Sequence, residues 1–247
     1  MTGFSDPAYF GELWADDYDT WNQPDPAAAV EFLTELAGDR RVLELASGTG
    51  RVTVPLAAQG VMVEGIEGSA SMVEQMRAKP GGEHIPVAIG DMADVSATGP
   101  FGLVFLVHNT MFNLLGREQQ ARCFRNAARV LDTDGAFVVE AYIPNPAWLD
   151  QNPVQVLEVT DISATIEVYK HDAANQSFRS QKITFDNQGM RLRPHAERYS
   201  WPNELDLMAE LADLRLDARY TGWDRQPFSS HSTKHVSVYR PASEVRG

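Results

Sequence analysis

Val42-Leu43-Glu44-Leu45-Ala46-Ser47-Gly48-Thr49-Gly50 is the stretch of this chain that decides its fold. An apolar strand that carries an acid runs into a turn of small residues, and the pattern at 51–59 then predicts a helix. Small residues let a ligand lie against the backbone, and a helix start offers unpaired N–H groups. Because Glu44 would repel a phosphate, the stretch favours a ligand that carries both an ammonium and a carboxylate.

Strands alternate with helices on either side of this stretch. Apolar strand candidates lie at 41–46, 61–66, 85–89, 103–107 and 136–141. Helical patterns lie at 51–59, 69–79 and 117–131. Near-continuous apolar strands joined by helical crossovers predict a parallel sheet that is covered on both faces.

The alternation changes after Tyr142. Prolines at 144, 146 and 153 mark a loop, and a period of two residues follows at 154–156, 165–169 and 181–185. Turn residues at 172–175 and 186–189 separate these segments, which predicts an antiparallel meander of about four strands. A helix with a cap-like start at Asn203, and strands near 214–223 and 235–239, then complete the α/β part.

Composition narrows the class of protein. A chain of 247 residues with 43% hydrophobic content can bury a core as one large domain or as a domain with an insert. The single cysteine, Cys123, excludes an internal disulfide and a multi-cysteine metal cluster, and its helical surroundings predict a packing role. A net charge of −13 disfavours nucleic acid as a partner. No signal region and no apolar run of membrane-spanning length is found, so we expect a cytoplasmic protein that does not bind membranes.

Acidic residues stand at the ends of three neighbouring strands. Ligands of an open parallel sheet bind beyond the carboxyl ends of its strands. Glu67 ends the second strand about 20 residues past the glycine turn, where an acid can accept hydrogen bonds from two ribose hydroxyls. The alternative is that Glu67 caps the helix that begins at Ser69. Asp91, in Gly90-Asp91-Met92, ends the third strand.

Together these strand ends resemble those of the class I S-adenosylmethionine-dependent methyltransferases. The first motif of that family, E/D-x-G-x-G-x-G, matches Glu44 to Gly50 except that Ala46 stands at the first glycine. We therefore expect this turn to avoid positive φ or to be slightly less tight. The resemblance implies S-adenosyl-L-methionine as cofactor, with Asp91 accepting from the adenine amino group. It implies cofactor contacts from Glu44, Ala46, Gly48, Gly50, Glu67, Gly68, Met72, Asp91, Met92 and Val107.

The expected fold class is α/β, with a Rossmann-like, doubly wound, mostly parallel seven-stranded sheet and an inserted antiparallel β meander. Residues 1–143 and 200–247 would form the methyltransferase core with an N-terminal lid, and 144–199 the insert. A nicotinamide dinucleotide enzyme is the main alternative. Its G-x-G-x-x-G fingerprint needs a glycine where Thr53 stands, and Glu44 would repel a pyrophosphate.

The fourth strand ends at His108 and Asn109, a point that faces the sulfonium methyl in the resembled fold. Neither the Pro-Pro-aromatic motif of DNA amino-methylating enzymes nor the acidic cluster of metal-dependent catechol methylators is present. His108 is either a general base or a structural residue, and Asn109 either orients the acceptor or closes a turn.

An aromatic stripe occupies the N-terminal segment: Tyr9, Phe10, Trp14, Tyr18 and Trp21. Helical spacing alone predicts a helix packed on the core. The resemblance adds a second interpretation, a lid over cofactor and substrate, in which Tyr9 and Tyr18 would be polar contacts in the catalytic site. Aromatic faces next to a sulfonium cation are favourable by about 0.5–2 kcal/mol.

Two histidines near the C-terminus have the spacing of a metal pair. His231 and His235 would need a helix to bind one ion, but 236–239 alternates like a strand, so we expect no metal. The aromatic loop at 223–228 is expected to form part of the acceptor wall.

The expected activity is methyl transfer to a small-molecule acceptor. Similar layouts occur among actinobacterial enzymes that methylate amino sugars and other antibiotic precursors, which favours N-methylation of an amine in secondary metabolism. The alternatives are O-methylation of a hydroxyl with His108 as base, and a non-catalytic protein that binds S-adenosylmethionine. An isolated meander is marginally stable, so the insert should roof the acceptor pocket or join the subunits of a homo-oligomer.

Overall fold

The computed structural model describes residues 3–4, 6–20 and 25–242. Its main sheet has seven strands in the order β10-β11-β5-β4-β1-β2-β3. The strands are β1 Val42–Leu45, β2 Val63–Glu67, β3 Val87–Ile89, β4 Phe101–Leu106, β5 Leu131–Tyr142, β10 Leu214–Tyr220 and β11 Lys234–Pro241. Pairing is parallel from β3 to β5 and antiparallel at β11 and β10. The mostly parallel seven-stranded sheet expected from the sequence is confirmed.

Helices cover both faces of this sheet, because neighbouring strand residues point to opposite sides. The main helices are α2 Ala27–Ala37, α3 Thr53–Ala58, α4 Ala70–Arg77, α5 Arg117–Val130 and α7 Pro202–Glu210. One buried cluster joins α5 and α7 to side chains such as Leu43 and Phe137. The other cluster joins α2 and α3 to Val42 and Val138, which are the chain neighbours of Leu43 and Phe137. Cys123 is fully buried in the first cluster, as its expected packing role requires.

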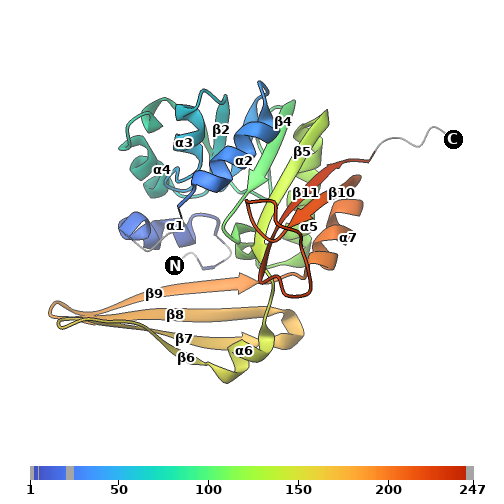
Figure 1. Cartoon of the computed structure of the whole chain (residues 1–247). Coiled ribbons are helices and arrows are strands. Elements are labelled where there is room, and N and C mark those ends of the chain that lie inside the picture. The colour runs from blue at the N-terminus through green and yellow to red at the C-terminus, as the bar shows by residue number, and fades with distance from the viewer. Residues whose placement is uncertain (1–2, 5, 21–24, 243–247) are drawn as a thin grey trace.

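A second sheet lies to one side of this core. It contains β6 Val154–Val159, β7 Ala164–Asp172, β8 Ser177–Asp186 and β9 Gly189–Arg198, paired antiparallel in sequence order. The expected meander and its two turns are therefore confirmed. A short helix, α6 Pro146–Gln151, leads into the sheet. In Figure 1 the sheet forms a long platform, and α1 (Tyr9–Trp14) lies between it and α4.

Some expected details of single elements are wrong. α7 begins at Pro202 with Trp201 as its N-cap, and Asn203 is an exposed residue of the first turn. Proline suits that position because it presets φ and lacks an N–H that would stay unpaired. β5 begins at Leu131, directly after α5, and α2 had no counterpart in the sequence prediction. Trp21 lies outside the described residues. Among those described, no helix is both long and apolar enough to cross a membrane.

Candidate active site

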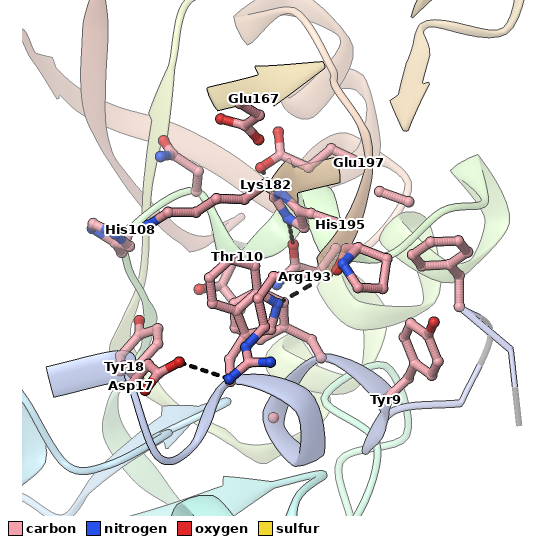
Figure 2. A pocket seen from close by; sticks show the side chains of 18 of the residues that line it. Tyr9, Asp17, Tyr18, His108, Thr110, Glu167, Lys182, Arg193, His195 and Glu197 are labelled. Atoms are coloured by element: carbon pink, nitrogen blue, oxygen red, sulfur yellow. Dashed lines mark hydrogen bonds and ion pairs between the residues drawn. The ribbon is translucent and has the colours of Figure 1, made fainter. Parts of the chain in front are cut away.

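A cavity of about 1410 Å³ lies between the main sheet and the second sheet. Pockets for one small ligand usually measure about 300–1,000 Å³, so this cavity has room for two. The expected site residues that line it are Tyr9, Tyr18, Ala46, Gly48, Glu67, Gly68, Met72, Asp91, Met92, His108 and Asn109. Glu44, Gly50 and Val107 do not line it. Figure 2 shows Tyr9 and Tyr18 on one side of the cavity and Glu167 and Glu197 of the second sheet on another.

The turn after β1 is built from residues with positive φ. Ala46, Gly48 and Gly50 have φ of 56°, 55° and 78°. The expectation that Ala46 would avoid positive φ is wrong. The left-handed conformation costs a residue with a Cβ about 1–2 kcal/mol. The fold imposes it because the Ser47 N–H, one residue on, donates to the Ile66 carbonyl at 3.1 Å and continues the pairing of β1 with β2.

Glu44 lies behind this turn. Its side chain is buried, with 3% of the residue exposed, and the Thr53 hydroxyl at the start of α3 donates to its carboxylate. Burial raises the pKa of Glu44 to about 8. The structure thus places Glu44 between the turn and the helix that follows, with no face on the cavity.

Glu67 ties two backbone segments together and also lines the cavity. Its carboxylate accepts from the Gly48 N–H at 2.7 Å, which ties down the glycine turn, and from the Ser69 N–H at 2.9 Å, at the start of α4. Ser69 itself is the N-cap of α4, with its hydroxyl accepting from the Met72 N–H at 3.2 Å. Burial raises the pKa of Glu67, yet the residue still lines the cavity.

The end of β3 contributes a short turn. Asp91 accepts from the Ala93 N–H at 2.8 Å through one carboxylate oxygen. Asp91 and Met92 both line the cavity next to Gly90. The three acidic strand ends therefore converge on one region, although Glu44 faces away from the open space.

The N-terminal segment packs closely onto the start of α4. Glu12 accepts from the hydroxyls of Ser69 and Ser71, at 2.7 Å each. A Cβ at Gly11 would lie 2.3 Å from the Ser69 Cβ, so glycine is required for this approach. Neither residue was identified from the sequence, because only the folded chain brings α1 against α4.

Aromatic packing carries the same segment across to the second sheet. Phe10 stacks on Trp14 at 5.5 Å and lies 5.5 Å from the His195 ring. Asp17 pairs with Arg193 at 2.7 Å. The segment is thus a packed helix, as helical spacing predicts, and its aromatic side chains also line the cavity. Burial raises the pKa of Tyr18, so its hydroxyl stays protonated.

His108 and Asn109 adopt positive φ, 58° and 62°. The His108 N–H donates to the Glu140 carboxylate at 2.9 Å, and the Asn109 side-chain oxygen accepts from the Tyr142 N–H at 2.7 Å. The Asn109 side chain therefore closes the turn. Burial lowers the pKa of His108. His108 lines the large cavity and also a smaller cavity of about 380 Å³, which Trp223 lines as well.

The C-terminal loop at 223–228 is absent from the lining of the large cavity. Its Trp223 and Asp224 line the smaller cavity, and the Trp223 indole donates to Glu140 at 3.0 Å. The expected place of this loop in the acceptor wall is therefore wrong for this structure. His235 is buried in β11, where its Nδ1 lies 2.8 Å from the Ser237 hydroxyl. The expected strand is confirmed.

The inner face of the second sheet supplies polar side chains that the sequence analysis did not single out. Because side chains alternate along a strand, every second residue of β7, β8 and β9 points into the cavity. Those that bear a charge or an imidazole near the core are Glu167, Lys182, Arg193, His195 and Glu197. Period-two alternation groups such residues on one face of a strand, but it does not show which face meets the core.

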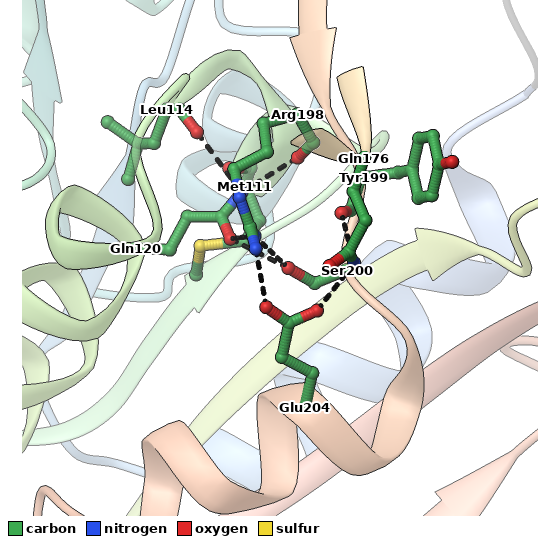
Figure 3. A network of polar contacts seen from close by, with 8 residues as sticks. All are labelled: Met111, Leu114, Gln120, Gln176, Arg198, Tyr199, Ser200 and Glu204. Carbon is green, nitrogen blue, oxygen red and sulfur yellow. Dashed lines mark hydrogen bonds and ion pairs between the residues drawn. The ribbon is translucent and has the colours of Figure 1, made fainter. Parts of the chain in front are cut away.

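A buried polar network fastens this sheet to the core (Figure 3). The Gln120 amide of α5 donates to the carbonyls of Met111, Leu114 and Arg198 at 3.2, 3.1 and 2.8 Å. Arg198 ends β9 and donates to the Gln120 side-chain oxygen at 2.7 Å and to Glu204 of α7 at 2.5 Å. The position of the cavity's insert wall is thus fixed by α5 and α7.

Comparisons with known proteins agree with this geometry. A family model described as a methyltransferase domain matches residues 42–135. The CcbJ methyltransferase structure from Streptomyces caelestis is 37% identical, with a TM-score of 0.89, and the match covers 96% of this chain and 100% of that one. The cypemycin N-terminal methyltransferase of a Streptomyces species is 26% identical over 95% of this chain and 98% of its own length. An amino pentose methyltransferase from Micromonospora echinaspora, solved with S-adenosylmethionine bound, is 17% identical with a TM-score of 0.70 over 92% and 95% of the two chains, and shows the fold.

The chain belongs to the class I S-adenosylmethionine-dependent methyltransferases. It is an enzyme of the small-molecule type within that family, and S-adenosyl-L-methionine is its methyl donor. The dinucleotide alternative and the non-catalytic alternative are thereby set aside.

Proposed function

We propose that this enzyme methylates an amine nitrogen of a small-molecule acceptor in secondary metabolism. The surroundings of His108 are the observation on which the choice of nitrogen rests. Within the described residues no side chain hydrogen-bonds the His108 imidazole, so nothing orients it as a base. A neutral amine attacks through its own lone pair and needs no base in that step, whereas an alcohol must lose its proton.

We propose that the cofactor occupies the part of the cavity at the ends of β1, β2 and β3. Positive φ and open space at Gly48 leave room for a ligand against its backbone, and the Glu67 carboxylate beside it can accept further hydrogen bonds from the hydroxyls of a ribose. Contacts would come from Ala46, Gly48, Glu67, Gly68, Met72, Asp91 and Met92. Glu44, Gly50 and Val107 would support these residues from behind.

Catalysis by this chain would consist mainly of alignment and exclusion of water. When bound, the cofactor supplies a methyl group that is reactive without further activation. The N-terminal segment, whose Tyr9 and Tyr18 line the cavity, would cover it and keep water out, while His108 and Asn109 line the wall at the end of β4. Holding two reactants in line is worth several kcal/mol, about 7–11 in favourable cases.

A labelled-methyl assay tests the choice of acceptor. The full-length enzyme is incubated with methyl-labelled S-adenosylmethionine and a panel of amino sugars, small amines and phenols, and products are identified by mass spectrometry. We expect label on nitrogen. Label on phenol oxygen with none on amines would contradict the proposal and favour the hydroxyl alternative with His108 as base.

We further propose that residues 144–199 act as one insert with two working faces. Its inner face would roof the acceptor, since it lines the cavity. Its outer face would pair with a second copy of the chain, because that face is apolar. Val156, Ile166, Ile183 and Leu192 lie directly opposite one another across all four strands.

A further inference from the structure

A carboxylate at the end of β9 closes the insert side of the cavity. The side chain of Glu197 is 10% exposed and lines the cavity. The Tyr142 hydroxyl donates to one carboxylate oxygen at 2.6 Å, and His195 Nε2 lies 3.5 Å from the other. Core and insert therefore each contribute a partner to this group.

The same contacts place Glu197 near the carboxyl end of β4. Asn109 holds the backbone of Tyr142, at 2.7 Å. His195 Nε2 lies 3.3 Å from the side-chain oxygen of Asn113, in the turn that follows Asn109. The carboxylate is thus tied from two directions to the strand end where His108 lies, which is where ligands of such sheets bind.

The surroundings of Glu197 are acidic and aromatic. Glu167 lines the same wall and accepts from the hydroxyls of Tyr169 and Ser180 at 2.6 and 2.7 Å. The Phe178 ring lies 5.7 Å from Tyr169 and 6.2 Å from His195. Carboxylates and aromatic faces together attract an organic cation.

The cationic side chains of the cavity are directed toward other groups. Arg193 pairs with Asp17 of the N-terminal segment at 2.7 Å, and Arg191 pairs with Asp186 at 2.9 Å. Lys182 lies opposite Glu167 on the neighbouring strand, and its ammonium is 5.8 Å from the centre of the Trp14 ring. Among the described residues, Glu197 itself forms no ion pair with an arginine or a lysine, so its carboxylate keeps its negative charge for a ligand.

We propose that Glu197 binds the amino group of the acceptor as an ammonium and takes one proton from it, which frees the nitrogen lone pair for methyl transfer, so that acceptors are basic amines and their hydroxyl analogues bind poorly. This inference rests on the proposed function above. The carboxylate would give the ammonium a charged hydrogen bond, and the rings of Tyr169 and Phe178 would line its apolar side.

The affinity for amines should depend on pH. Burial raises the pKa of Glu197, so its carboxyl becomes neutral at a higher pH than an ordinary glutamate. The titratable groups that face it are His195, Tyr142, Glu167 and Tyr169. Because a neutral carboxyl no longer attracts an ammonium, amine affinity should fall as the pH is lowered toward and through this raised pKa.

The test uses the full-length enzyme loaded with S-adenosylhomocysteine and two matched pairs of probes. Glucosamine is compared with glucose, and cyclohexylamine with cyclohexanol, by ligand-observed NMR titration over a pH series. We expect the wild type to prefer each amine by at least about tenfold, as a charged hydrogen bond implies. In Glu197→Gln that preference should vanish together with its pH dependence, while affinity for the alcohols is unchanged.

The variant and its control are chosen to preserve the fold. Glutamine keeps the shape of the side chain and an oxygen for the Tyr142 hydroxyl, so Glu197→Gln should fold. Glu210→Gln makes the same change on the exposed end of α7 and should behave as wild type.

The outcomes separate two failures. A wild type that does not bind S-adenosylhomocysteine contradicts the proposed function. A wild type that binds it but prefers neither amine, including one that binds neither member of a pair, overturns the role of Glu197, as does a Glu197→Gln enzyme that keeps the preference. Should Glu197→Gln lose S-adenosylhomocysteine affinity, the wild-type pH series decides: amine affinity that stays constant while the pH falls overturns the proposal.

Discussion

At the scale of single residues, Glu67 is the side chain whose removal should affect the cofactor most directly. Its carboxylate lines the cavity and accepts from the N–H groups of Gly48 and Ser69. Glu67→Ala should weaken S-adenosylmethionine binding by about 1–3 kcal/mol, because two ribose hydroxyls lose a charged acceptor. Calorimetry with S-adenosylmethionine and with its demethylated product measures this.

The control for that change is Glu64→Ala, on the same strand. Glu64 pairs with Arg41 at 2.5 Å and does not line the cavity, so cofactor affinity should not change. If Glu67→Ala lowers thermal stability but leaves cofactor affinity intact, Glu67 serves only the glycine turn and the start of α4.

His108 distinguishes an amine acceptor from a hydroxyl acceptor. Burial lowers its pKa, so the imidazole is neutral at neutral pH, as a base must be. With an amine acceptor, His108→Ala should cost less than about tenfold in turnover, and the pH profile should follow the ionisation of the amine. Steady-state kinetics across pH measures both, with His231→Ala, an exposed histidine, as the control.

The contrary result would have a distinct signature. A loss of about a hundredfold or more that shrinks at high pH, with cofactor affinity retained, would identify His108 as a general base and the acceptor as a hydroxyl compound.

Residues at the strand ends were predictable from the sequence because the motif fixes their spacing along the chain. Glu67 and Asp91 follow apolar strands, and such strands end at one edge of a parallel sheet. Glu197 and His195 were not predictable from the sequence. Alternation alone gives each strand two faces, and only the folded insert shows which face meets the core. The positive φ of Ala46 was not predictable, because the strand pairing at Ser47 outweighs its cost.

At the scale of elements, the alternating strands and helices were predictable because each carries its own hydrophobic period. The start of α7 was not predictable. Its N-cap position is Trp201, and Asn203, a residue type that is common at N-caps, lies one residue after Pro202 inside the helix. The early start of β5 was not predictable either. Its first residues, 131–134, are polar or half-exposed, so they lack the apolar pattern that is typical of a buried strand.

The attachment of the insert depends on α7 as well as on β9. Arg198 is buried, with 9% of its side chain exposed, and its ion pair with Glu204 compensates that burial. Glu204→Ala leaves this charge without its carboxylate and should lower the free energy of unfolding by about 1–3 kcal/mol, since Glu204 is partly exposed and Arg198 keeps its bonds to Gln120 and Ser200. Chemical denaturation measures the change.

Glu210→Ala, on the exposed end of the same helix, is the matched control and should change stability by less than about 0.5 kcal/mol. Equal effects of the two substitutions would mean that the network contributes nothing beyond ordinary helix stability.

At the scale of the whole molecule, the two sheets divide the work of the proposed enzyme. Strand ends of the core would hold the methyl donor, while the inner face of the insert would hold the acceptor, and the N-terminal segment lies between the core and the insert and lines the cavity. The outer face of the insert remains apolar in this arrangement.

That outer face predicts self-association. Val156 is 68% exposed and Leu192 48%, and both belong to the row that crosses all four strands. A continuous apolar surface of this kind is usually covered by a partner, and a second copy would contact it with the same side chains.

Sedimentation of the wild type should show an oligomer. The double substitution Val156→Lys and Leu192→Lys should dissociate this oligomer, because lysine ammonium groups resist burial. Glu210→Lys, which also introduces a lysine but lies at the exposed end of α7 outside the insert, should leave the oligomer intact. A wild type that sediments as a monomer would contradict self-association through the outer face of the insert.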